Sequence, residues 1–199
     1  MPGKNVGTLI VGGGQAGLAM SAHLIRRGAP HVVLERRRIA ERWRTERWDS
    51  LVANGPAWHD RFPAKTFSDV GADDFASKDS VAAYFERFAA EIGAPVRCGV
   101  EVRAVRRARR GGRFEVDTSD GPLEADNVVA ATGPFQRPVI PAAAEGAPGL
   151  RQMHSSAYRN PDQLADGAVL VVGAGSSGAQ IADELLRADG EVDAASRPQ

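Results

Sequence analysis

Two glycine-rich segments have the spacing of loops that bind phosphate groups. The first follows an apolar run at residues 8–11, reads Gly12-Gly13-Gly14-Gln15-Ala16-Gly17, and precedes a helical stretch over residues 18–27. In such a turn the first glycine permits the bend, the second lets the backbone approach a pyrophosphate, and the third lets helix and strand pack closely. Free N–H groups at the helix start attract the anion. The segment predicts a dinucleotide site at Gly12, Gly14, Gln15 and Gly17.

The strand after this helix ends in an acidic residue. Residues 31–35 are His-Val-Val-Leu-Glu, a mostly apolar run whose last member is Glu35. A carboxylate at this point of a dinucleotide-binding unit accepts hydrogen bonds from the ribose hydroxyls of an adenosine. A solvated glutamate at a strand end is the alternative. The full series of strand, glycine turn, helix, strand and acid predicts binding of FAD or NAD.

The second glycine-rich segment repeats this arrangement. Residues 168–172 form an apolar strand, followed by Gly173-Ala174-Gly175-Ser176-Ser177-Gly178 and a helical stretch over residues 179–186. The next strand-like piece, residues 191–195, leads into Ser196-Arg197 instead of an acid. An arginine there suits a 2′-phosphate and favours NADPH over NADH, the alternative being a frayed arginine without a partner. The predicted cofactor contacts are Gly173, Gly175, Ser176, Ser177, Gly178 and Arg197.

The residues between the two loops predict a sheet enlarged by inserted strands. Residues 80–92 have helical periodicity with a serine cap, and residues 96–106 and 113–118 alternate as strands joined by a turn at 110–112. Residues 123–131 form a further strand that runs into Thr132-Gly133-Pro134. Thr132 and Gly133 would let the backbone pass close to a cofactor.

Prolines at positions 134, 138, 141 and 148 stiffen the segment that follows and predict a domain boundary near residue 138. We therefore expect an α/β fold. A Rossmann-like FAD-binding domain with inserted β-strands, lacking its C-terminal portion, would occupy residues 1–138. The start of a second Rossmann-like NAD(P)-binding domain would occupy residues 139–199. Two loops in one chain indicate hydride transfer from a nicotinamide to a flavin.

Composition excludes several other classes of protein. Acidic and basic residues balance at 25 each, which argues against a nucleic-acid or membrane-surface partner, and the arginine clusters at 36–38 and 103–113 are typical of solvated strand edges. A single cysteine, Cys98, rules out a Cys-x-x-Cys pair within these residues, and the four histidines are too scattered for a metal site. No leader sequence or apolar run of about 20 residues is present, so we expect a soluble, cytoplasmic protein.

With these residues assembled, the chain resembles the flavin-containing monooxygenases, including Baeyer–Villiger enzymes and related bacterial oxidoreductases. The resemblance rests on both glycine loops, Glu35, Trp43-Arg44, residues 47–51, residues 131–133 and His154-Ser155-Ser156-Ala157-Tyr158. It implies that Trp43 lies near the flavin and the Val102 backbone near the adenine. It also implies that Asn54 sits beside the isoalloxazine ring as the candidate catalytic residue. A turn residue before Gly55 is the alternative for Asn54.

The resemblance further implies a mechanism for the family. NADPH would reduce FAD, oxygen would add as a C4a-hydroperoxide, and one oxygen atom would pass to a small-molecule nucleophile or ketone. The alternatives are an NADPH-dependent flavin reductase or oxidase, and a non-catalytic fragment that binds a nucleotide.

The sequence departs from the family at two points. The family's identifying stretch is Phe-x-Gly-x-x-x-His, whereas Ala147 replaces the phenylalanine here and four residues separate Gly149 from His154. The chain is also shorter than its relatives and stops inside the second unit. We therefore expect the apolar helix face of Ile181, Leu185 and Leu186 to stay partly exposed. An open sheet edge would favour a homodimer, and turnover of NADPH by this chain alone would be absent.

Overall fold

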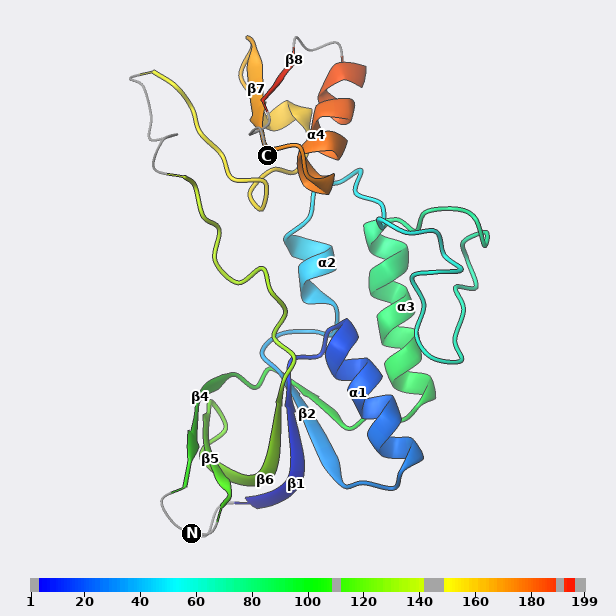
Figure 1. The fold of residues 1–199 in the computed structure, drawn as a ribbon, viewed down its shortest axis with the longest axis vertical. Coiled ribbons are helices and arrows are strands. Elements are labelled where there is room, and N and C mark those ends of the chain that lie inside the picture. Colours follow the sequence, from blue (N-terminus) through cyan, green and yellow to red (C-terminus); the bar gives the residue numbers. More distant parts are fainter. Residues whose placement is uncertain (1–3, 109–111, 142–148, 189–191, 196–199) are drawn as a thin grey trace.

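The computed structural model describes residues 4–108, 112–141, 149–188 and 192–195. Its larger part is a six-stranded sheet in the order β3-β2-β1-β6-β5-β4 (Figure 1). Four strands run parallel: β1 (Lys4–Val11), β2 (His31–Glu35), β3 (Val96–Cys98) and β6 (Leu123–Ala130). The strands β4 (Val102–Arg107) and β5 (Phe114–Thr118) are antiparallel and extend the sheet beyond β6. This arrangement confirms the predicted Rossmann-like fold with inserted strands.

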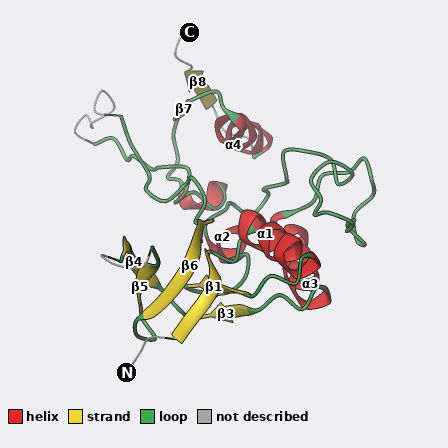
Figure 2. Cartoon of the chain, turned by 60° about the horizontal axis from the view of Figure 1, so that its bottom comes forward, coloured by secondary structure: helices red, strands yellow, loops and turns green. Residues whose placement is uncertain are grey.

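Helices connect the parallel strands on one side of the sheet. α1 (Gln15–Arg26) links β1 to β2, and α2 (Glu41–Thr45) and α3 (Lys78–Glu91) lie between β2 and β3. α1 and α3 lie side by side in both views (Figure 2). The register pairs Ile10 of β1 with Val33 of β2 and Val129 of β6, so β1 is a central strand with a partner on each side.

The sheet has a hydrophobic core on each face because strand residues alternate in direction. Leu9 and Leu34 belong to one cluster, which includes Val116 of β5 and Leu123. A separate cluster joins α1 and α3 to the long irregular segment at residues 46–77. Within it the buried Tyr84 hydroxyl donates to the Lys65 carbonyl at 2.7 Å and accepts from the Phe62 N–H at 2.7 Å.

Two boundaries in this region differ from the sequence expectation. α3 begins at Lys78, and its cap is Ser77, whose Oγ accepts the Ser80 N–H at 3.1 Å. The predicted strand over residues 96–106 is two strands, β3 and β4, at opposite ends of the sheet. They separate at Gly99, whose φ of +77° turns the chain. The predicted turn lies partly outside the described residues.

The smaller part contains the second glycine loop. β7 (Val169–Val172) pairs in parallel with β8 (Val192–Ala195), and α4 (Ser176–Arg187) connects them (Figure 1). A short 3-10 helix, η2 (Pro161–Gln163), precedes this unit.

The expected exposure of the α4 apolar face is wrong for two of its three residues. Ile181 and Leu185 are 7% and 5% exposed, because they pack against Trp48, Leu51 and Tyr158. Only Leu186 is open to solvent, at 58%. Irregular segments therefore cover the part of the apolar helix face that would otherwise need a larger sheet.

Candidate functional site

The first glycine loop needs glycine at two positions for reasons internal to the protein. Gly12 has a φ of +111°, and a Cβ there would lie 2.5 Å from the Ala131 carbonyl oxygen. A Cβ at Gly17 would lie 1.9 Å from the Gly12 carbonyl oxygen. Both distances are too short for any side chain. These two glycines hold the loop tightly against α1 and against the end of β6.

Gly14 differs, because the protein itself does not require a glycine there. No atom lies within 4 Å of the position a Cβ would occupy. Gly14 is the N-cap of α1, no side chain caps the helix, and its first turn, which includes the exposed Gln15, has no acidic residue. The N–H groups at the positive end of α1 therefore face an open cradle. This is the geometry that a pyrophosphate requires.

Glu35 lies at this same loop. Its Oε2 accepts the Gly13 N–H at 2.8 Å, and its Oε1 accepts the Arg37 N–H at 2.9 Å. Each carboxylate oxygen has a further lone pair with which to accept a ribose hydroxyl. The structure thus brings the predicted acid to the loop. The contact to Gly13 was missed, because only the folded loop shows which N–H points at the acid.

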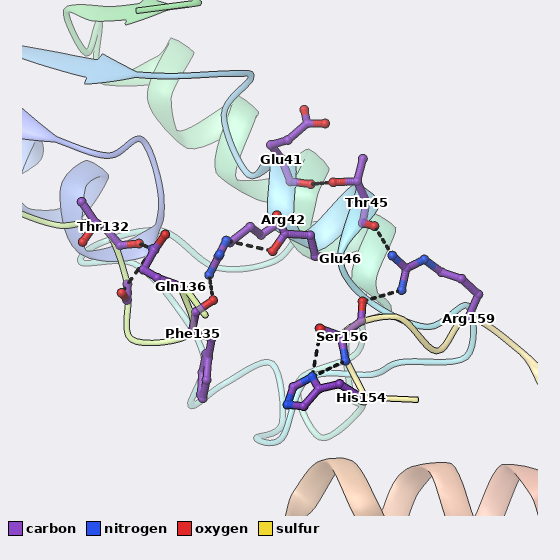
Figure 3. A network of polar contacts seen from close by, with 11 residues as sticks. Glu41, Arg42, Thr45, Glu46, Thr132, Phe135, Gln136, His154, Ser156 and Arg159 are labelled. Carbon is purple, nitrogen blue, oxygen red and sulfur yellow. Dashed lines mark hydrogen bonds and ion pairs between the residues drawn. The ribbon is translucent and has the colours of Figure 1, made fainter. Parts of the chain in front are cut away.

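The segment after β6 completes this side of the site (Figure 3). The Gln136 amide donates to the Thr132 carbonyl and, at 3.3 Å, to the carbonyl of Gly133, which has a φ of +78°. Arg42 of α2 donates to the Phe135 carbonyl. Since the neighbouring Ala131 carbonyl packs on Gly12, Thr132 and Gly133 are placed beside the first loop.

Trp43 and Val102 occupy packing positions near this site. Trp43 on α2 is half-buried, its ring meets Phe85 edge-on at 6.5 Å, and the Arg47 guanidinium stacks over it at 5.6 Å. Val102 opens β4 and packs in the cluster that contains Leu34, beside Glu35. The predicted cofactor contacts of both residues stay predictions.

Asn54 lies against the second unit. Its Oδ1 accepts the Gln180 Nε2–H of α4 at 3.1 Å. Both residues line a shallow groove of about 410 Å³, together with Val52, Phe75, Ser176 and Ala179. No local sequence signal points to Gln180, because the contact joins residues 126 positions apart. Asn54 thus contacts α4 across the two parts of the molecule, and its predicted catalytic role stays a prediction.

The second glycine loop repeats the geometry of the first. Gly173 has a φ of +114°, a Cβ at Gly178 would lie 1.8 Å from the Gly173 carbonyl oxygen, and Gly175 has open space. Ser176 and Ser177 open α4 and are exposed. The predicted Arg197 lies outside the described residues.

A hydrogen bond anchors α4 to the segment before it. The Tyr158 hydroxyl donates to Glu184 Oε2 at 2.7 Å, and burial, followed by the nearby Glu184 carboxylate, raises the pKa of Tyr158 well above its usual range. The hydroxyl therefore keeps its proton at neutral pH. Just before it, the His154 ring accepts the Ser156 N–H at 3.1 Å, and Arg159 binds the Ser156 and Thr45 carbonyls (Figure 3).

The described part of the chain has no group of three or more histidine, cysteine, aspartate or glutamate residues arranged to hold a metal ion. None of its helices is long and apolar enough to cross a bilayer.

The sequence profile described as pyridine nucleotide-disulphide oxidoreductase matches residues 9–199, nearly the whole chain. The chain belongs to this family. Both glycine loops of this family member fall inside the matched region, as does Glu35. Since Cys98 is the one cysteine in these residues, the pair that a disulphide-reducing site needs is not formed within them.

Curated relatives of this chain include oxidoreductases and monooxygenases. An uncharacterized CzcO-like oxidoreductase from Geobacillus kaustophilus is 40% identical over 90% of this chain and 51% of its own length. The rice indole-3-pyruvate monooxygenase YUCCA1 is 35% identical over 91% of this chain and 45% of its own length. The chain thus spans about half the length of the curated relatives it matches.

Solved structures of flavoproteins share the fold. A flavin-containing monooxygenase from Stenotrophomonas maltophilia superposes with a TM-score of 0.83 and 27% identity, over 98% of this chain and 59% of its own. Cyclohexanone monooxygenase from Rhodococcus, bound to NADP+, has a TM-score of 0.72 and 21% identity, over all of this chain and 39% of its own length. At this identity the likeness is one of fold alone. These likenesses confirm the expected resemblance to flavin-containing monooxygenases.

Proposed function

We propose that this chain is the FAD- and NADPH-binding part of a flavin-dependent monooxygenase. The observation that carries the proposal is the presence of two glycine loops with the same backbone geometry in one chain. Enzymes that pass a hydride from a nicotinamide to a flavin need two dinucleotide sites. The relatives named as monooxygenases support the choice among flavoenzymes.

The first loop fits the FAD. The N–H groups of α1 would hold the pyrophosphate above Gly14, and Glu35 would accept the ribose hydroxyls. Thr132 and Gly133 would lie along the cofactor, because the preceding Ala131 already contacts Gly12. Trp43 and the Val102 backbone are proposed to approach the flavin and the adenine.

The second loop fits the nicotinamide dinucleotide. Gly173, Gly175 and Gly178 would hold its pyrophosphate as the first loop does, with Ser176 and Ser177 as further donors. Arg197 is proposed to select NADPH. Its replacement by alanine should erode the preference for NADPH over NADH, and an equal loss of affinity for both coenzymes would contradict its role.

Asn54 stands where the two units meet. When bound, the flavin supplies the electron transfer and the oxygen chemistry, and the protein supplies orientation and exclusion of water. Because Gln180 donates to the Asn54 oxygen, the Asn54 NH₂ group is left to donate to a ligand in the groove. We propose that this amide orients the nicotinamide or the flavin ring. The oxygen-transfer step itself, the small-molecule substrate, the use of molecular oxygen, a homodimer and a cytoplasmic location stay predictions.

The domain assignment is part of the same proposal. We place the FAD-binding domain at residues 1–138 and the start of the NAD(P)H-binding domain at residues 139–199. Limited proteolysis followed by mass spectrometry tests the boundary, with first cuts expected between Pro134 and Gly149. First cuts inside the six-stranded sheet would contradict it.

Titration of the purified chain with FAD and then with NADPH tests the proposed function. We expect one FAD per chain, seen as protein-bound absorbance near 450 nm, and separate binding of NADPH. Absence of flavin binding at cofactor concentrations of about 100 μM would reject the proposal. In a full-length version of this sequence, the hydrogen peroxide released per NADPH consumed separates a monooxygenase from the reductase or oxidase alternative. Near-complete conversion to peroxide in the presence of substrates indicates the reductase or oxidase. In a full-length monooxygenase, Asn54→Ala should leave FAD bound and raise the peroxide yield.

A further inference from the structure

Arg47 is a half-buried cation without an anionic partner. Its guanidinium carbon lies 5.6 Å from the ring centre of Trp43 and 5.8 Å from that of Phe135. Its Nε is buried and has no hydrogen-bond partner. In the described part of the chain no carboxylate forms an ion pair with it. The adjacent Glu46 is paired with Arg42, at 3.0 Å.

No anion among the described residues pairs with Arg47 to compensate the partial burial of its charge. Cation–π contacts with two rings offset part of the desolvation of a guanidinium, but a partly buried charge normally has a hydrogen-bonded partner. Burial, and next the like charge of Arg42, lower the pKa of Arg47. Three other arginines on and beside α2 differ in having an ion-pair partner, although the Nε of Arg44 is also buried without a hydrogen-bond partner. Arg42 and Arg44 are paired with Glu46 and Glu86, and Arg38 with Glu41.

Arg47 lies between the elements that carry the two glycine loops. Phe135 follows the segment whose Ala131 carbonyl packs on Gly12 of the first loop. Trp48, the next residue after Arg47, packs with Ile181 and Leu185 of α4, which begins at the second loop. A ligand held by Arg47 would therefore sit near the junction of the two nucleotide units. Each loop has its own N–H groups for a pyrophosphate, so neither pyrophosphate requires Arg47.

We propose that Arg47 binds the carboxylate of an organic acid with an apolar body. The guanidinium offers a planar set of donors that matches a carboxylate in two parallel hydrogen bonds. Phe135, 70% exposed, forms an aromatic wall beside it. An apolar wall next to one charged anchor is the usual composition of a small-molecule site. That this acid is the compound oxidised at the flavin rests on the proposed function.

Phenylacetate and phenylacetamide serve as probes, because they have nearly the same shape and differ in charge. Binding to the purified chain is measured by ligand-observed NMR. We expect phenylacetate to bind at least tenfold more tightly than phenylacetamide. Arg47→Met should abolish this difference, Arg47→Lys should keep part of it, and the control Arg107→Met, an exposed arginine on β4, should leave it unchanged. Unchanged preference in Arg47→Met overturns the proposal.

Thermal unfolding separates binding from a structural role. Because methionine can pack on both rings without a charge, ligand-free Arg47→Met should melt at the same temperature as wild type or higher. A lower melting temperature in Arg47→Met would make Arg47 a structural residue and overturn the proposal. Tighter binding of inorganic phosphate than of phenylacetate, with competition by FAD, would assign Arg47 to a cofactor phosphate and also overturn it.

The link to the flavin is tested apart from the site. With FAD bound, phenylacetate should shift the flavin absorbance in wild type and in Arg107→Met but not in Arg47→Met. Binding of phenylacetate without such a shift would keep the carboxylate site and reject its place beside the flavin. Absence of FAD binding would reject the proposed function. The preference for phenylacetate over phenylacetamide, measured by NMR, would still test the role of Arg47.

Discussion

The two glycine loops have one local geometry and two different surroundings. In each loop the first glycine has a φ near +110° (111° and 114°), and the last would place a Cβ within 2 Å of a carbonyl oxygen (1.9 and 1.8 Å). The middle glycine faces open space in both. Around Gly12, however, the Ala131 carbonyl lies 2.5 Å from a Cβ position, whereas nothing lies within 4 Å at Gly173.

The difference comes from the strands beside each loop. β1 is paired on both sides, and its Leu9 and Ile10 are fully buried. Among the described residues β7 is paired on one side only, and its Leu170 and Val172 are 61% and 66% exposed. The bend of a phosphate loop is therefore a local property. The rigidity and the further contacts of such a loop depend on its neighbours.

The largest effect is expected from a methyl group added to the last glycine of each loop, where the helix packs on the loop carbonyl. Gly17→Ala and Gly178→Ala both force the helix away from the loop carbonyl. We expect Gly17→Ala to lower the unfolding free energy by about 3 kcal/mol or more, because α1 packs in the main core. Gly178→Ala should leave the main denaturant-induced transition nearly unchanged. Equal destabilisation by the two variants would show that the units unfold as one.

The middle glycines test binding without a large effect on folding. Gly14→Val and Gly175→Val place side chains in open space, at extended backbone angles that valine adopts. Each variant should melt near the wild-type temperature. Gly14→Val should raise the Kd for FAD by about 100-fold or more and leave the Kd for NADPH unchanged. Gly175→Val should raise the Kd for NADPH by a similar factor and leave the Kd for FAD unchanged. Retention of wild-type flavin content in Gly14→Val would mean that the first loop is wrongly assigned.

The acid is the next difference between the loops, since Glu35 contacts Gly13 and no acid contacts the second loop in the described residues. Glu35→Ala should weaken FAD binding by about 1–3 kcal/mol through lost ribose hydrogen bonds. Glu35→Gln should lose less, because its amide oxygen still accepts. FAD and NADPH titrations of both variants measure this effect. A loss of NADPH affinity equal to the loss of FAD affinity would place the acid at a site shared by both cofactors.

The smallest effect is expected at the anchor of the second unit. Tyr158→Phe removes the hydrogen bond to Glu184 and should cost about 0.5–1.5 kcal/mol, confined to α4. Hydrogen exchange of α4 amides should quicken, while exchange in β1 stays unchanged. Because the pKa of Tyr158 is raised, the contact persists as pH rises through the ordinary tyrosine range and is lost only above it. Quicker exchange across both units would show that Tyr158 stabilises more than α4.

Much of this protein could be predicted because its decisive signals are local. Strand, glycine turn and helix follow each other within about 20 residues at both loops, and β2 has the predicted bounds at residues 31–35. Helix starts were less well predicted. Ser77 and Ser80 are both plausible caps, and only the first places its oxygen on the N–H three residues ahead.

The fold class, the two loops and the acid at Glu35 follow from the sequence alone, because backbone sterics and short-range periodicity act between near neighbours. The folded chain, by contrast, divides residues 96–106 between two sheet edges and buries Ile181 and Leu185 under Trp48, Leu51 and Tyr158. It alone also brings Asn54 to Gln180 and leaves Arg47 between two rings without a carboxylate. These outcomes depend on contacts between residues far apart in the chain. Such contacts form only when distant segments of the chain pack on the same buried surface. No local sequence pattern specifies which segment packs there.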